Sequence, residues 1–257
     1  MFLISALAVI SVVSGPGTDS LAAGRRIAAS VQLAAQEYRN GVSAGRVTDT
    51  AEVDEARLFL TEARRTAQVL PARIASSATA DIDHMLLLIS RVAEPDSMAA
   101  SARHASANLA TALGASLDDV PDRTPSLRQG AAVFQRECSS CHGVTGRGDG
   151  AAARSLTPPP ADLTVASQLA LVSPLDFYQR VTIGVAGTAM PAFETRLTPA
   201  DRWAVALYAS TLRQAAPSGD VPLALRSFPT VAELTDSAVL AALGPAASPG
   251  RLAAVRA

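Results

Sequence analysis

The chain has 257 residues, a length that permits one large hydrophobic core or two smaller ones. Its 22 basic residues, all arginine, nearly balance 23 acidic ones, so a net charge of −1 gives no electrostatic case for nucleic-acid binding. Aromatic residues make up only 4% of the chain and alanine is abundant, which favours helices and disfavours a β-sandwich. These limits predict an all-α protein.

The first segment, residues 1–17, is predicted to be a signal peptide. Its apolar run, FLISALAVISVV, has about a dozen residues, too few for a bilayer span of ~20 but typical of a secretory signal. No Lys or Arg precedes the run, which departs from the usual signal, and the start of a buried helix is the alternative. No later stretch stays apolar for ~18 residues, so the sequence predicts no membrane span.

Residues 18–115 repeat apolar side chains at spacings of three and four, the period of an amphipathic helix. Four such stretches, separated by Gly, Pro and Asp, predict an antiparallel four-helix bundle. They are Ile27–Tyr38, Val53–Leu70, Ile82–Val92 and Met98–Ala112. We expect Asp96 to cap the fourth helix at its N-terminus and Gly114 to end it.

Three acidic residues near the junction of the first two predicted helices form a candidate iron site. Glu37, Glu52 and Glu55 supply carboxylates, which together with imidazole are suitable ligands for iron. The alternative is electrostatic, because acids in the first turn of a helix complement its dipole and arginines follow on the same helix. His84 and His104 are expected to be surface or partly packed residues of the bundle.

The composition changes at residues 116–126 (SLDDVPDRTPS), whose acids and prolines lack a helical period and predict a linker. The second domain, residues 127–214, is expected to hold three helices and a Gly- and Pro-rich loop at 143–164. The three predicted helices are Leu127–Glu137, Ser173–Ile183 and Thr198–Leu212. Residues 215–257 are expected to form a tail with one short helix, Asp236–Leu243.

The two cysteines of the chain, Cys138 and Cys141, directly precede His142 in the sequence RECSSCHG. Such a pair has three ordinary interpretations. A zinc site needs more ligands than this region offers, and a thioredoxin-like redox pair needs a βαβ pattern around it. Cys-x-x-Cys-His is also the signature of c-type haem attachment, with the thiols bonded to the haem vinyl groups and His142 bound to the iron. This third interpretation requires a second iron ligand.

Met190 is the predicted second ligand, because haem iron in electron-transfer sites is commonly held by one His and one Met. Of the four methionines, Met1 lies in the leader, while Met85 and Met98 fall on core positions of the bundle. Met190 stands instead in the loop sequence GTAMPAF, where the following proline restricts its backbone to an extended geometry.

From about residue 126 to residue 212 the sequence resembles a class I c-type cytochrome domain. The resemblance rests on the haem-attachment motif, a Met-Pro pair and small and aromatic helix residues, namely Gly130, Phe134, Cys138–Gly143, Met190, Pro191, Trp203 and Tyr208. It implies one covalent haem c, with His142 and Met190 as the axial ligands. It also implies that the first and last helices cross closely, at Gly130 and Tyr208.

The same resemblance suggests residues that support the haem pocket. The backbone carbonyl of Pro158, Pro159 or Pro160, with Pro160 as the named candidate, is implied to accept a hydrogen bond from the other ring nitrogen of His142. Trp203 of the last helix is implied to support the pocket. Arg147 and Arg180 are candidates for charge-assisted hydrogen bonds to the haem propionates, with solvated arginines as the alternative.

The whole chain is similar to the extracytoplasmic part of bacterial cytochrome c/high-affinity iron permease fusion proteins. The similarity rests on the order of the segments EYRNGV, TGRGDG, PPPADLT and PTVAEL. In those proteins a membrane-embedded permease follows, at the point where this sequence stops. A separate permease, a stand-alone descendant and a truncated chain are therefore all open.

The sequence thus predicts an exported electron carrier rather than an enzyme, since no Ser-His-Asp, paired-carboxylate or nucleotide-binding arrangement stands out. The fusion resemblance implies iron uptake, in which ferrous iron is oxidised and the electron leaves through the haem to a redox partner. It also implies an iron permease as a partner and a periplasmic location, with membrane association through a partner. Two alternatives are a cytochrome subunit serving a respiratory oxidase or dehydrogenase, and an iron-binding bundle with an accessory haem.

Overall fold

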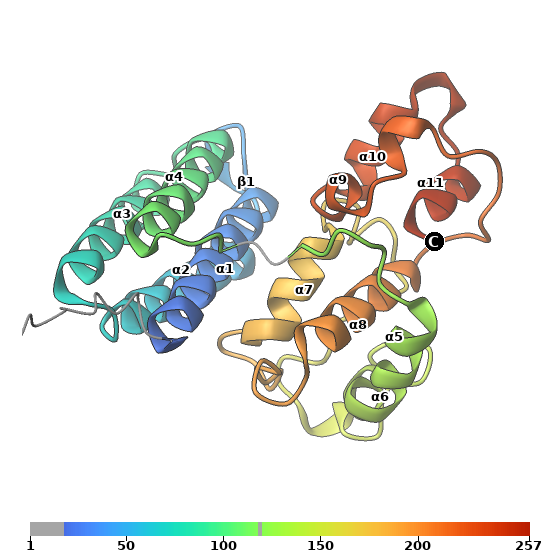
Figure 1. Cartoon of the computed structure of the whole chain (residues 1–257), viewed down its shortest axis with the longest axis horizontal. Helices are drawn as coiled ribbons and strands as arrows, with labels where there is room; N and C mark the ends of the chain where they lie inside the picture. The colour runs from blue at the N-terminus through green and yellow to red at the C-terminus, as the bar shows by residue number, and fades with distance from the viewer. Residues whose placement is uncertain (1–17, 118–119) are drawn as a thin grey trace, which may run out of the picture.

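The computed structural model describes residues 18–117 and 120–257, so the predicted signal peptide lies outside the described residues. Almost all regular structure in these ranges is helical, apart from one short hairpin of β1 (Val42–Ser43) and β2 (Arg46–Val47). The all-α class is confirmed (Figure 1). None of the helices that the structure describes has both the length and the apolar character of a membrane span.

Four long helices form the first domain, as predicted: α1 (Thr18–Gly41), α2 (Thr50–Ala67), α3 (Ala72–Ser90) and α4 (Pro95–Leu113). Consecutive helices contact one another, and α4 returns to contact α1, which closes the bundle (Figure 1). The repeating apolar side chains meet along its centre, where Ile82, Met85 and Met98 are 0% exposed. Both methionines are therefore core residues of the bundle.

The helix ends of the bundle show how local sequence sets the boundaries. Asp49 precedes α2, and its side chain accepts a hydrogen bond from the amide of Ala51. Gly114 ends α4 with a φ of +63°, a left-handed conformation that glycine adopts without strain, as predicted. The prediction that Asp96 caps α4 is wrong: Glu94 occupies the cap position and Pro95 begins the helix. Proline favours the first helical position because it lacks an amide hydrogen.

The second domain is organised around a crossing of α5 (Leu127–Val133) and α8 (Pro199–Thr211), with α7 (Pro174–Ile183) packed on α8. Beyond α5 the chain continues through a π-helical turn, Phe134–Cys138, into the short α6 (Ser139–His142). The single helix expected before the cysteines is therefore divided into segments of different winding.

The crossing of α5 and α8 depends on Gly130. A Cβ at this position would lie 2.1 Å from the carbonyl oxygen of Ala204 and 2.7 Å from the Cβ of Tyr208. No residue with a side chain permits such an approach without displacing a helix. The predicted approach of Tyr208 to Gly130 is therefore confirmed. The ring of Phe134 also lies 5.5 Å from that of Tyr208, centroid to centroid.

Residues 215–257 belong to the core of the second domain and carry more helix than predicted. Besides α10 (Asp236–Leu243), which matches the prediction, they form α9 (Phe228–Ala232) and α11 (Pro249–Arg256). Their buried hydrophobic side chains are Leu225, Phe228, Val231, Ala232, Val239, Leu243, Leu252 and Val255. Helices this short depend on tertiary packing rather than on local sequence, which explains why the sequence pattern shows only α10.

A buried ion-pair network fastens this segment to the end of α8. Asp236 accepts hydrogen bonds from Arg213 Nε at 2.8 Å and from Arg256 Nη2 at 3.0 Å, and both arginine side chains are 0% exposed. Other guanidinium N–H groups donate to main-chain carbonyls, including those of Val172 and Val231. Burial lowers the pKa of both arginines, and the charge of Asp236 opposes this effect.

Candidate haem site

The Cys-x-x-Cys-His segment forms a tight helical turn. Cys138 ends the π-helical turn, and Cys141 and His142 lie in α6. Both cysteines are free thiols, and Cys138 packs partly against the hydrophobic cluster of the second domain. Burial, followed by the nearby charge of Glu137, raises the pKa of Cys138 to about 12. The thiol is therefore protonated at neutral pH.

The surroundings of the turn disfavour the zinc and thioredoxin-like interpretations. A structural zinc site usually takes four ligands from Cys and His, whereas this turn supplies only Cys138, Cys141 and His142. Within residues 18–117 and 120–257, no three His, Cys, Asp or Glu side chains form a group that could hold a metal ion. The flanking elements are helices and loops rather than a βαβ unit.

His142 is oriented by a backbone carbonyl, because its Nδ1 lies 3.2 Å from the carbonyl oxygen of Ala161. A carbonyl oxygen only accepts, so Nδ1 carries the proton and Nε2 is left to bind a metal. Burial lowers the pKa of His142, which favours the neutral, metal-binding ring, and the bond to Ala161 opposes this in part.

The acceptor predicted for His142 was one residue away from the observed one. The carbonyl of Pro160 does not face the imidazole; it faces Gly148, where an added Cβ would lie 2.4 Å from the Pro160 oxygen. The carbonyl oxygen of Ala161 is the one within hydrogen-bonding distance of Nδ1. The assignment to Pro160 is therefore corrected to Ala161.

A Gly-rich loop after the histidine folds back over the turn. Three of its amides donate to carbonyls of the turn at 2.8–3.1 Å, in the pairs Gly148 to His142, Gly150 to Cys141 and Ala152 to Ser140. Gly148 has a φ of +73°, a conformation that disfavours other residues. The segment TGRGDG thus satisfies carbonyls that the end of a helix leaves without partners, and it holds the turn in place.

Met190 lies in the connection between α7 and α8, in residues 184–193, called here the Met190 loop. Main-chain hydrogen bonds close the loop, from the amide of Val185 to the carbonyl of Met190 at 3.2 Å and from Phe193 to Val181 at 3.0 Å. The Met190 side chain is partly buried against the same hydrophobic cluster as Cys138. Among the methionines that the structure describes, Met190 alone lies outside the bundle.

The other residues predicted to support the haem pocket have different contacts. Arg147 is exposed, and it adds a small effect to the hydrogen bonds from Thr164 that lower the pKa of Asp162. Trp203 is 2% exposed and stacks on Tyr178, with ring centroids 4.2 Å apart, so its described contacts are those of a core residue.

Arg180 forms an ion pair with a residue of the bundle. Its guanidinium donates to Glu37, and the two side chains are 18% and 5% exposed. The structure gives Arg180 a partner in the bundle, and its role at a haem propionate stays a prediction. A charged side chain buried to this extent needs an opposite charge, and Glu37 of α1 supplies it.

The three acids of the candidate iron site lie close enough to influence one another. Burial, a hydrogen bond with Glu37 and the charges of Glu37 and Glu55 raise the pKa of Glu52 to about 7. Burial also raises the pKa of Glu55. Because Glu37 pairs with Arg180 and no metal-holding group forms among the described residues, the iron site stays a prediction. His84 and His104 are exposed on α3 and α4, as expected.

Sequence reasoning missed two groups at this site. The carbonyl of Ala161 has no side-chain signal that could have identified it. Glu137, next to Cys138, pairs with Arg136 at 2.8 Å and with Arg196 at 2.7 Å. Arg196 follows the Met190 loop, so Glu137 ties the Cys-x-x-Cys-His turn to the chain beyond the loop. The only sequence signal for this role was the acidic residue next to the motif.

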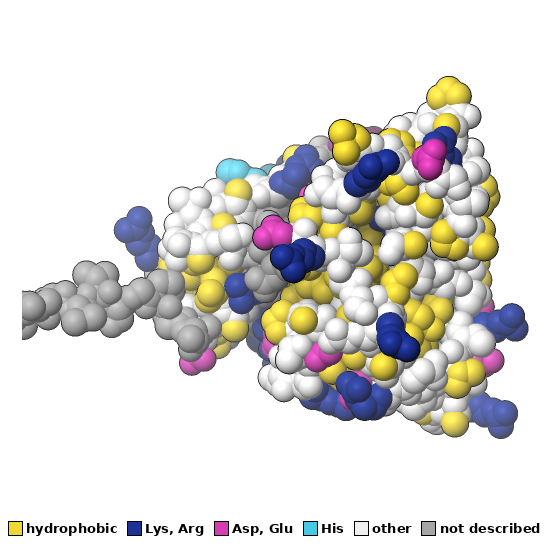
Figure 2. Space-filling model, turned by 45° about the vertical axis from the view of Figure 1, so that its right-hand side comes forward, with side chains coloured by type: hydrophobic (Ala, Val, Ile, Leu, Met, Phe, Trp, Pro, Cys, Tyr) yellow, Lys and Arg dark blue, Asp and Glu magenta, His cyan; other side chains and the backbone are white. Residues whose placement is uncertain are grey.

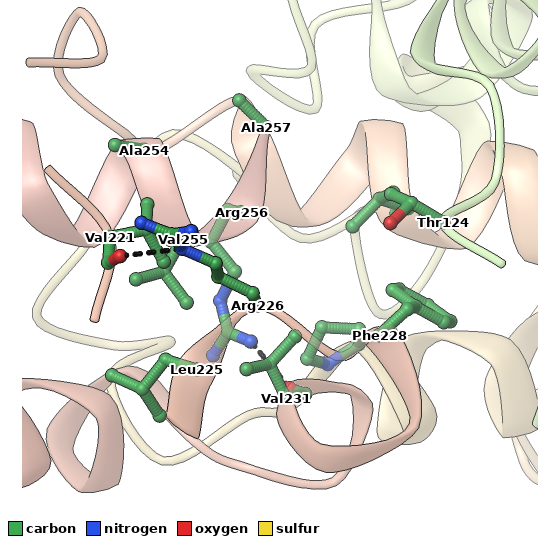
Figure 3. A pocket seen from close by; sticks show the side chains of 12 residues that line it. Thr124, Val221, Leu225, Arg226, Phe228, Val231, Ala254, Val255, Arg256 and Ala257 are labelled. Carbon is green, nitrogen blue, oxygen red and sulfur yellow. Dashed lines mark hydrogen bonds between the residues drawn. The ribbon is translucent and has the colours of Figure 1, made fainter. Parts of the chain in front are cut away.

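A separate cavity of about 290 Å³ lies near the C-terminal helices, away from these residues. Its lining includes Phe228, Val255 and Arg226, and Arg226 donates to the carbonyl of Val221 at 2.9 Å (Figure 3). None of the predicted haem ligands lines it. The cavity therefore does not belong to the candidate haem site.

The donor set fits a covalent haem c. Two free thiols and an imidazole with an available Nε2 share one helical turn, and a loop methionine packs on the same hydrophobic cluster as the first thiol. The closely crossed helices α5 and α8 frame this turn. Fold and site together define the second domain as a c-type cytochrome domain.

Comparison with known proteins divides the chain into the same two domains. Residues 125–208 match the family model described as "Cytochrome C oxidase, cbb3-type, subunit III", and residues 18–116 match "Iron permease-associated 4-helix bundle domain". The chain therefore joins an iron permease-associated four-helix bundle to a cytochrome c domain, and the cytochrome domain implies covalently bound haem c.

The remaining comparisons are sparse. No curated protein matches the chain. A chain of the reducing HAO-like protein complex of Kuenenia stuttgartiensis is 29% identical over 44% of this chain and 60% of its own length, with a TM-score of 0.34. The match thus spans less than two thirds of that protein.

Proposed function

We propose that this protein is an extracytoplasmic monohaem c-type cytochrome that transfers single electrons in iron uptake. The observation that carries the proposal is the geometry of His142, which shares one turn with two free thiols while its Nδ1 is tied to Ala161. The chain contains one such motif, hence one haem. Bound there, the haem supplies one-electron chemistry at its iron. Cys138 and Cys141 would hold the haem covalently, and His142 and Met190 would bind its iron.

The bundle supports the link to iron, since its family model is that of a domain associated with iron permeases. In the proposed reaction a ferrous ion gives up one electron and becomes ferric. The cytochrome domain accepts that electron and passes it to a redox partner protein, so electrons balance at one per iron. A membrane iron permease would receive the ferric ion.

The surface of the cytochrome domain is suited to brief docking of a redox partner. Arginines lie singly across the face that comes forward in Figure 2, with apolar side chains between them. Val144, two residues after His142, is 67% exposed. Mixed and modest surfaces of this kind are typical of transient electron-transfer complexes, which bury less area than stable ones.

A second candidate function is that of a cytochrome subunit in a respiratory oxidase. It is favoured by one observation, the description of the family model that residues 125–208 match. The two candidates differ in the electron donor. Under the first, ferrous iron should reduce the ferric protein with one electron per ion. Under the second, a purified oxidase should retain the chain while ferrous iron leaves it oxidised.

Covalent attachment is the first test. The exported protein should carry one haem, seen as a mass increment and as a haem stain that survives denaturation. Replacing both Cys138 and Cys141 by Ala should abolish the stain, because each thiol forms one thioether. Ser139→Ala together with Ser140→Ala, in the same turn, is the matched control and should keep it. Covalent haem in the double cysteine variant would contradict the assignment.

A further inference from the structure

The bundle meets the cytochrome domain through α1 and α7, and α7 is the helix that leads directly into the Met190 loop (Figure 1). Two polar contacts join these helices. Gln179 donates to Gln32 at 2.8 Å, and Arg180 pairs with Glu37 in a largely buried ion pair. The entry to the loop is therefore held by the bundle.

The Met190 loop and its flanks also touch the bundle directly. Ile183 and Val185 pack against the hydrophobic cluster of the bundle. Gly187 faces Leu58 of α2, because a Cβ on the glycine would lie 2.8 Å from Leu58 Cδ1. Apolar contacts with the first domain therefore accompany the loop from its beginning to its tip.

The exit from the loop is held as well. Glu194, just after the loop, pairs with Arg26 of α1 at 2.5 Å, and the two side chains are 20% and 37% exposed. Contacts with the bundle therefore occur before, within and after the ten residues that contain Met190. Such contacts restrict the loop to one arrangement, which a loop bonded only to its own domain need not keep.

We propose that the bundle positions the axial methionine, with Arg26, Glu37 and Leu58 as positioning residues for Met190. This inference rests on the proposed ligation of the haem by Met190. Because a thioether favours ferrous iron, a loop that spends time away from the iron lowers the reduction potential. The coupling is reciprocal, so a change in the bundle alters ligation at Met190 and a change in ligation alters the bundle.

The test uses the full-length protein with its haem. Arg26→Ala, Glu37→Gln and Leu58→Ala should each weaken the ferric thioether charge-transfer absorbance and lower the reduction potential. Exogenous imidazole, which competes with Met190 for ferric iron, should bind about fivefold or more tightly to these variants. Exchanging the charges, with Arg26→Glu and Glu194→Arg together, should restore the absorbance that Arg26→Ala loses.

Arg64→Ala is the matched control, because Arg64 pairs with Asp83 at 3.2 Å between α2 and α3, away from the cytochrome domain. It should leave the absorbance, the potential and imidazole binding unchanged. Circular dichroism and the haem stain verify that each variant is folded and loaded. If Arg26→Ala folds poorly, the charge-exchange variant still tests the inference. If that variant folds but lacks the absorbance, the inference is overturned.

Met190→Ala separates this inference from the proposed function. If Met190→Ala loses the absorbance while all the interface variants keep it, the bundle does not position the ligand, and the ligand assignment stands. If Met190→Ala itself keeps the absorbance, Met190 is not the ligand, and both the assignment and the inference built on it are overturned.

Discussion

The bundle and the cytochrome domain assemble their cores from different distances along the chain. The buried residues of the bundle core lie between 23 and 117 and come mainly from four consecutive helices. The core of the second domain combines residues from 133 to 255, including short helices that follow α8 by many residues. One core thus follows a local repeat, and the other depends on contacts between distant segments.

The two domains also differ in their roles, because the bundle mainly contributes stability and the cytochrome domain contains the predicted haem ligands. The bundle is held by repeated apolar packing, and it contacts the Met190 loop through part of its surface. The cytochrome domain holds the predicted haem ligands and relies on a close helix crossing and a buried ion-pair network. Substitutions should therefore divide into those that unfold one domain and those that alter ligation.

Asp236→Ala should have the largest effect on stability. It removes the acid that pairs with Arg213 and Arg256, whose side chains are 0% exposed, and leaves two buried positive charges. Breaking a buried pair by removing one partner costs about 3–5 kcal/mol. Urea unfolding followed by haem absorbance should show this loss in the cytochrome domain.

The matched control is Asp83→Ala in the bundle. Asp83 pairs with Arg64, and the two side chains are 46% and 53% exposed. Exposed pairs contribute only ~0–1 kcal/mol, so this variant should unfold close to the parent. Equal losses in both variants would show that the network around Asp236 is not the feature that anchors the C-terminal helices.

Replacing two methionines, one in each domain, tests the same distinction between stability and ligation, with an effect of intermediate size. Met85 is 0% exposed in the bundle, so Met85→Ala should cost about 2–5 kcal/mol of unfolding free energy and leave the haem spectrum unchanged. Met190→Ala should remove the thioether charge-transfer absorbance and lower the reduction potential, with a smaller loss of stability. Spectra and denaturation of both variants check this; a spectral change in Met85→Ala would contradict it.

The bundle could be predicted from sequence because its helices each bury one face with a period that the sequence repeats. The prediction failed at the cap of α4, where the preference of Pro95 for the first helical position starts the helix one residue before Asp96. The last 43 residues were harder, since α9 and α11 are short and bury side chains against elements far away in sequence.

The candidate haem site was predictable to the extent that side chains carry it. Cys138, Cys141 and His142 are consecutive in a motif, and the loop sequence distinguished Met190 from the core methionines. The histidine's acceptor is a main-chain carbonyl, which any residue offers, so the choice of Ala161 depends on the path of the backbone. Pairs such as Arg26 with Glu194 span 168 residues and leave no local pattern.

The smallest expected effect concerns the titration of Glu52 in the bundle. Burial, then the hydrogen bond with Glu37, then the charges of Glu37, Glu55 and Asp49 raise the pKa of Glu52 from its ordinary 4.5 to about 7. Burial and the charge of Glu37 also raise the pKa of Glu55, and the positive charge of Arg180 from α7 offsets part of that rise. Between these two pH values the folded protein binds more protons at Glu52 than the unfolded chain does.

The folded state should therefore lose stability as the pH rises from about 4.5 to about 7. One unit of pKa corresponds to about 1.4 kcal/mol, and partial exposure of Glu52 to solvent reduces the effect, so we expect a decrease on the order of 1 kcal/mol. Glu52→Gln should remove this slope and stabilise the bundle at pH 8, whereas Asp54→Asn, at an exposed position on the same helix, should keep it. Urea unfolding at pH 5, 6, 7 and 8, followed by far-ultraviolet circular dichroism, measures the slope. A slope that persists in Glu52→Gln would assign the titration to Glu55, whose pKa burial also raises.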